Sequence, residues 1–169
     1  KQRGLEPLAE YIMKQDAKAP VETEAEKYVT GVMSPASDSR EDMIRAQEKE
    51  VRDTEAAISG AEDIIAEQIS DNAGYRTYIR NITEKEGLIV SCAKNKEMKS
   101  VYENYYDYTE PVSKTAGHRI LALNRGEKEK ILTVGIEAPA ERITAYLEKQ
   151  VITSDNQYTS PVIMSALMD

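Results

Sequence analysis

Three carboxylates in one segment, Glu62, Asp63 and Glu67, have a spacing that could support chemistry. If the segment is helical, they lie within about one turn of one another, where two carboxylates can share a cation or a proton. Charged residues at this spacing more often form the solvated face of a helix. We therefore expect neither a metal site nor catalysis from this group.

A second polar group contains His118 and Arg119, followed by Arg125. Histidine can act as an acid, a base or a metal ligand, but no serine or cysteine nucleophile stands beside it here. If a helix spans about 116–124, His118 and Arg125 fall two turns apart on one side. This arrangement favours a capping or salt-bridge role over catalysis.

The sequence lacks the signatures of common phosphate, dinucleotide and zinc sites. It contains no GxxxxGK[ST], GxGxxG, HExxH or CxxC pattern, and its one cysteine, Cys92, and one histidine cannot assemble a Cys/His metal site. We predict that the chain is not an enzyme and needs no cofactor or metal. A single cysteine also fits the reducing cytoplasm.

Four tyrosines, Tyr102, Tyr105, Tyr106 and Tyr108, are crowded within residues 102–108. Interleaved with positive charge, such a cluster could stack on the bases of a single strand. The charged residues between and beside these tyrosines are instead acidic and would repel a phosphate backbone. The pattern favours structural packing or a surface that contacts another protein.

Composition limits the classes of partner. The chain has 22 Lys and Arg against 30 Asp and Glu, a net charge of −8, which argues against a free-standing duplex-binding domain. Any contact with nucleic acid should therefore be local or weak.

No apolar run approaches the roughly 20 residues of a membrane-spanning helix, so we expect no membrane association. The first residue is not methionine and the chain stops at Asp169 within an apolar stretch, so we expect a piece of a longer protein.

Apolar spacing predicts the elements that position these residues. Helices are expected over 5–15, from Pro20 to about 31, over 40–69 as one helix or two with a bend near Gly60, over 72–86, and from about 138 to 151. We expect the helices on either side of residues 70–72 to form an antiparallel pair. Residues 88–93 could be a strand or an apolar lead into a loop, and 131–136 is strand-like. The predicted fold is mainly α, a multi-helix bundle with at most two short strand-like segments, divided into 1–33 and 40–169.

Four stretches together resemble a known family: Arg3–Ala9, Gly60–Arg80, Tyr102–Pro111 and Gly117–Leu132. In this order they are similar to the N-terminal half of bacterial Tex-type transcription accessory proteins. The resemblance implies the helical N-terminal region of a protein that also has helix-turn-helix, RNase H-like, helix-hairpin-helix and OB-fold parts. The OB-fold domain usually carries the main RNA-binding surface of the family. No carboxylate of this chain matches the acidic positions of the RNase H-like domain, so no nuclease activity carries over.

From these patterns and this resemblance we expect a non-catalytic, cytoplasmic scaffold and interaction module. Its expected partners are RNA or DNA, bound through the full-length protein mostly by domains that this chain does not contain. The transcription machinery is a further candidate partner. Arg119 and Arg125 are the predicted phosphate contacts. The alternative is a stand-alone protein-interaction module that binds a basic partner through an acidic, tyrosine-rich surface containing Tyr102–Tyr108.

Overall fold

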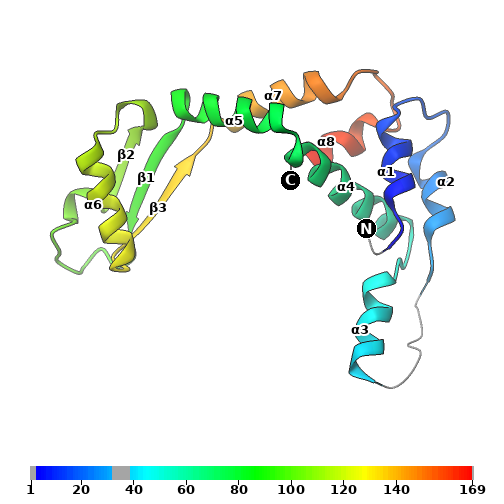
Figure 1. Ribbon diagram of the computed structural model, residues 1–169, viewed down its shortest axis with the longest axis horizontal. Helices are drawn as coiled ribbons and strands as arrows, with labels where there is room; N and C mark the ends of the chain where they lie inside the picture. Colours follow the sequence, from blue (N-terminus) through cyan, green and yellow to red (C-terminus); the bar gives the residue numbers. More distant parts are fainter. Residues whose placement is uncertain (1–2, 32–38, 169) are drawn as a thin grey trace. The chain divides into compact units, whose positions relative to one another are not determined.

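A computed structural model describes residues 3–31 and 39–168, and packing divides the chain into two compact units (Figure 1). The first unit contains residues 1–72 and 144–169, and the second contains residues 73–143. The elements in chain order are α1 (Glu6–Met13), α2 (Val21–Ala25), η1 (Glu26–Tyr28), α3 (Arg40–Lys49), α4 (Thr54–Asp71), α5 (Ala73–Glu86), β1 (Leu88–Ala93), η2 (Glu103–Tyr105), β2 (Asp107–Pro111), η3 (Val112–Lys114), α6 (Gly117–Lys128), β3 (Leu132–Glu137), α7 (Ala140–Val151) and α8 (Ser160–Met168).

Helix α4 is the centre of the first unit and packs against α1, α2 and α8. Its apolar residues recur every three or four positions, which places them on one face. Ile65 of that face is completely buried, as are Ile12 of α1 and Ile163 of α8. Gly60 lets α1 approach closely, because a Cβ at this position would lie 2.4 Å from the Leu5 Cδ1 atom. The predicted bend near Gly60 is therefore wrong, since this glycine serves close packing inside a continuous helix.

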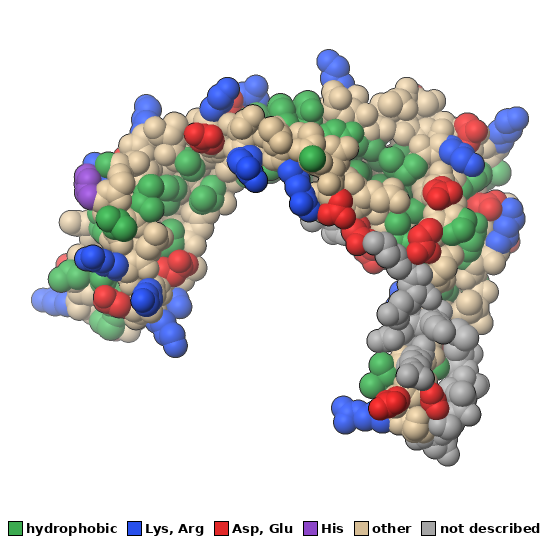
Figure 2. Space-filling view, viewed as in Figure 1, with side chains coloured by type: hydrophobic (Ala, Val, Ile, Leu, Met, Phe, Trp, Pro, Cys, Tyr) green, Lys and Arg blue, Asp and Glu red, His purple; other side chains and the backbone are tan. Residues whose placement is uncertain are grey.

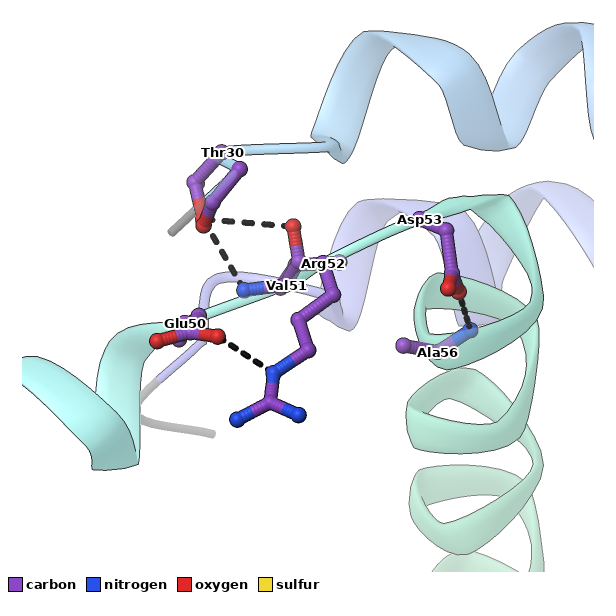
Figure 3. Close-up of polar contacts among 7 residues, drawn as sticks. Thr30, Glu50, Val51, Arg52, Asp53 and Ala56 are labelled. Atoms are coloured by element: carbon purple, nitrogen blue, oxygen red, sulfur yellow. Dashed lines mark hydrogen bonds and ion pairs between the residues drawn. The ribbon is translucent and has the colours of Figure 1, made fainter. Parts of the chain in front are cut away.

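The alternative prediction of one long helix over 40–69 is also wrong, because the run breaks between α3 and α4, where hydrogen bonds of Val51 and Asp53 separate the two helices (Figure 3). Val51 is completely buried and forms an isolated β-bridge with Gly31. Its N–H donates to the Thr30 Oγ1 atom at 2.9 Å. The Asp53 carboxylate then accepts from the Ala56 N–H at 2.8 Å, which caps the start of α4.

The end of α1 is fixed by a buried glutamine. Gln15 has a φ of 55°, a left-handed conformation that usually favours glycine. Its side-chain Nε2 donates to the Val151 carbonyl at 2.8 Å, and its Oε1 accepts from the N–H groups of Thr153 at 2.9 Å and Ser154 at 3.0 Å. One side chain thus joins α1 to the turn that follows α7.

The helices flanking Asn72 pack in different units, α4 as described above and α5 against η3. The predicted antiparallel pair of these two helices stays a prediction. The predicted extents of α1, α5 and α7 are confirmed to within two residues at each end. No helix among the described residues is long and apolar enough to cross a membrane.

The second unit contains a three-stranded antiparallel sheet in the order β2-β1-β3. The prediction of a multi-helix bundle is therefore wrong: the fold is mixed α/β, although helices dominate. Both strand-like segments are strands, and the third strand, β2, lies within the tyrosine-rich stretch. The sequence pattern did not indicate this strand because most of its residues are charged or aromatic. Tyr108 and Glu110 nevertheless lie on the face of the sheet that α6 covers, where the Tyr108 hydroxyl and the Glu110 carboxylate have polar partners.

Helix α6 covers one face of this sheet. The core contains Ile89 of β1, Tyr102, Leu123 of α6 and Leu132 of β3, all at most 8% exposed. Gly126 is the point of closest approach, because a Cβ there would lie 2.5 Å from the Leu132 Cδ1 atom. The helix can therefore sit on the sheet only because this position has no side chain.

Candidate interaction surface

Arg119 joins α6 to the edge strand β2. Its Nη1 atom forms an ion pair and a hydrogen bond with the Glu110 Oε1 atom, and the Tyr108 hydroxyl donates to Glu110 Oε2. The Glu110 side chain is 17% exposed and that of Arg119 is 41% exposed. Both carboxylate oxygens are thus engaged inside the unit. A phosphate contact by Arg119 stays a prediction, and it would have to compete with Glu110.

This cluster gives the second unit a specific response to acid. The pKa of Glu110 is lowered, first by the hydrogen bond from Tyr108 and then by the hydrogen bond from Arg119. A lowered pKa in the folded state means that the carboxylate stabilises the fold above its ordinary pKa of 4.5 and loses this effect as the pH falls through the folded value.

We therefore expect Glu110→Gln to lower the thermal unfolding midpoint at pH 7 and to flatten its further fall below pH 4.5. The check is the unfolding midpoint at pH 7, 5, 4 and 3. Glu141→Gln, at an exposed position in α7, is the control and should keep the wild-type pH dependence. Equal pH dependence in the two variants would contradict this assignment.

The four tyrosines mostly pack against the core of the second unit. Tyr102 is 7% exposed, and its hydroxyl donates to the Glu129 Oε1 atom at 2.9 Å. The rings of Tyr105 and Tyr108 meet edge to face, with centroids 5.2 Å apart. The Tyr106 hydroxyl donates to the Met98 carbonyl at 2.5 Å. The rings are buried or half-buried, so they hold η2 and the preceding loop against the sheet.

His118 and Arg125 both lie exposed on α6, in its first and last turns. Arg125 lies near the negative end of the helix dipole, where a cation is favourable. Its charge also lowers the pKa of Tyr102, but the hydrogen bond to Glu129 is the main influence and raises that pKa overall. The structure brings Arg125, but not Arg119, to the end of the helix beside the 128–131 turn.

The carboxylates of α4 do not converge. Asp63 and Glu67 are exposed, and Glu62 borders an open pocket of about 530 Å³ whose rim also includes Glu22 and Glu55. Among residues 3–31 and 39–168, no group of three or more His, Cys, Asp or Glu side chains is placed to hold a metal ion.

Charge differs between the two units. The second unit, residues 73–143, contains 12 Lys and Arg and 10 Asp and Glu. The first unit, which contains the remaining residues, has 10 Lys and Arg and 20 Asp and Glu. The acidity of the chain therefore belongs to the first unit, and the tyrosine cluster belongs to the second. Neither unit by itself combines a strongly acidic composition with that cluster.

Comparison with known proteins identifies the family. Residues 16–159 match the sequence model described as Tex central region-like. The chain belongs to the Tex family. Among its relatives, YdcI of Bacillus subtilis is 42% identical over the whole chain, and the Tex protein of Bordetella pertussis is 32% identical over 86% of it. A Neisseria gonorrhoeae protein named transcriptional accessory protein Tex is 26% identical over 80% of the chain.

The chain spans 22%, 17% and 16% of the lengths of these three Tex relatives. The family is the one that the four sequence stretches indicated, and the matching description refers to its central region.

Sequence reasoning missed two residues of this Tex module, other than glycine, whose backbone is left-handed, Gln15 and Lys130. No sequence pattern indicates the structural role of Gln15, because its three hydrogen-bond partners lie more than 130 positions away along the chain. Lys130 has a φ of 60°, and lysine is not a residue type that indicates a left-handed backbone. The position of Lys130 can be recognised only from the structure, as the residue after Glu129, the C-cap of α6.

Proposed function

We propose that this chain is a non-catalytic module of a Tex-family transcription accessory protein, where it acts as a scaffold and an interaction surface. One observation carries the proposal: several polar side chains, including the candidate residues Arg119 and Tyr102, are bound to partners within their own unit. Arg119 pairs with Glu110, Tyr102 with Glu129, and Gln15 with the turn after α7. Such groups hold secondary structure together and are not free to bind a substrate.

In this proposal RNA or DNA binds mainly to other parts of the full-length protein, which works in the cytoplasm and can contact the transcription machinery. The net charge of −8 supports this division, because nucleic acid is repelled by most of the chain. The name of the gonococcal relative refers to transcription, and the relatives are several times longer than this chain.

Fluorescence anisotropy tests the proposal. The chain and a full-length Tex relative are titrated into labelled single-stranded RNA, single-stranded DNA and duplex DNA, at low and near-physiological salt. We expect the full-length protein to bind at near-physiological salt and the chain alone to bind at least 100-fold more weakly, as an order-of-magnitude estimate of losing the main electrostatic surface. Comparable affinities at that salt would contradict the scaffold role.

A further inference from the structure

Two segments of the second unit meet at one end of its sheet: the loop 94–102 after β1, and residues 125–131, which form the last turn of α6 and its connection to β3. The Lys94 N–H donates to the Ile131 carbonyl at 2.9 Å, which continues the β1–β3 pairing to the ends of these segments. The Tyr102 hydroxyl bonds Glu129 across the same junction. Six exposed cations project from these segments, and we call them the basic end: Lys94, Lys96, Lys99, Arg125, Lys128 and Lys130.

At the basic end the six cations outnumber the acidic residues, of which there are four. The same two segments and Glu103 contribute four acidic residues, of which Glu129 accepts from Tyr102 and Glu103 accepts from the Ser100 N–H. The Lys96 Nζ atom lies 3.9 Å from the Asp107 Oδ2 atom, and an exposed ion pair at this distance is weak. Figure 2 shows Lys and Arg side chains gathered where α6 and β3 meet. The first unit has no comparable excess, with twice as many acidic as basic residues.

The loop that carries three of the lysines has an ordered backbone. The Tyr106 hydroxyl bonds both the Met98 carbonyl and the Ser100 Oγ atom, the latter at 2.8 Å. The Glu97 N–H donates to the Asn95 Oδ1 atom at 3.0 Å. Because these contacts fix the loop before any ligand arrives, little backbone entropy is lost on binding.

Lys130 provides an independent observation. The Lys130 N–H donates to the Glu127 carbonyl and the Ile131 N–H donates to the Gly126 carbonyl, both at 2.9 Å, the two bonds of a Schellman helix end. Glycine is favoured at the left-handed position of this motif, yet lysine occupies it with a φ of 60°.

The comparison with Gln15 shows why this lysine needs an explanation. At Gln15 a similar left-handed backbone is explained by three side-chain hydrogen bonds. The Lys130 side chain is exposed and has no hydrogen-bond or ion-pair partner among the residues that the structure describes. Strained residues are often retained for function, and here the side chain adds only a charge to the basic end.

We infer that the basic end binds the phosphate backbone of nucleic acid. Five of its six cations are lysines, which are common phosphate ligands and are depleted at protein–protein interfaces. The nearby ring of Tyr102 is buried, so the surface offers charge without an exposed aromatic platform, and no base preference follows. This inference rests on the proposed function: the basic end is an auxiliary contact that supplements the main nucleic-acid surface of the full-length protein.

The test measures binding of the whole chain to labelled single-stranded RNA by anisotropy, from 50 to 200 mM salt. If all six cations meet phosphates, affinity should fall about 300-fold over this range, and about 20-fold after three contacts are removed. The test variant is Lys94→Gln with Lys99→Gln and Lys128→Gln. Its control removes the same charge from exposed lysines of the first unit, as Lys14→Gln with Lys18→Gln and Lys149→Gln, and should keep the wild-type salt dependence.

A single variant, Lys130→Gly, separates function from folding. We expect it to raise the thermal unfolding midpoint, because glycine relieves the left-handed strain, and to weaken RNA binding at 50 mM salt. A structural role for the lysine would instead lower the midpoint.

Three results would overturn the inference: no RNA binding by the chain at 50 mM salt, equal salt dependence in the test and control variants, or tighter binding of a glutamate-rich peptide than of RNA. None of these would affect the scaffold proposal, which fails only if the chain matches the full-length protein at near-physiological salt.

Discussion

Replacing Gln15 by alanine should lower the free energy of unfolding by about 2–4 kcal/mol, because buried groups that lose their only polar partner each cost about 1–3 kcal/mol. Gln15 is 5% exposed and serves the Val151 carbonyl and the N–H groups of Thr153 and Ser154. Alanine would also keep the strain of a left-handed backbone. Urea unfolding followed by circular dichroism measures the change.

The matched comparison is Gln15→Gly, which removes the same bonds but relieves the strain. It should recover about 1 kcal/mol of the loss and still be less stable than wild type. An unfolding midpoint in urea that is unchanged for both variants would show that the turn after α7 does not depend on this side chain.

Gly126→Val should have an effect of similar size in the second unit, about 2–3 kcal/mol, as expected for overpacking a closed core. The new Cβ would lie 2.5 Å from the Leu132 Cδ1 atom, 2.8 Å from its Cγ atom and 3.3 Å from the Tyr102 Cδ1 atom. Leu132 is completely buried and cannot move aside without displacing its neighbours. The helix would have to lift from the sheet, and thermal unfolding would report the loss.

Gly135→Val is the control for this prediction. It lies on β3 in the same unit, no atom of the residues that the structure describes lies within 4 Å of a Cβ added there, and valine suits a strand. We expect its unfolding midpoint to equal or exceed that of wild type. Equal destabilisation by the two valines would mean that the contact between α6 and β3 is looser than the structure shows.

The parts of the fold that could be predicted are those in which apolar spacing alone decides the structure. The helices α1, α5 and α7 follow from local periodicity and recognisable ends. The strand β2 could not be recognised, because its residues Asp107–Pro111 are polar and aromatic, and their burial depends on pairing with β1 and on Arg119 of α6. The break before α4 was missed because it depends on the bridge between Val51 and Gly31, which are distant in sequence.

The candidate residues could be selected by type, but their roles depend on tertiary contacts. Arg119 and the tyrosines stood out in the sequence, yet only the sheet register places Glu110 and Tyr108 beside Arg119. Likewise, a left-handed backbone at Gln15 or Lys130 follows from how a helix meets its neighbours and cannot be recognised from glutamine or lysine.

The most direct test of the claim that these polar groups serve the architecture is Arg119→Met, measured for both thermal unfolding and RNA affinity at 50 mM salt. Lys114→Met, at an exposed position of η3, removes the same charge as a control. We predict that Arg119→Met unfolds at a lower temperature than the control and binds RNA as the control does. An unchanged unfolding temperature with a greater loss of RNA affinity than the control would contradict this claim and make Arg119 a phosphate contact.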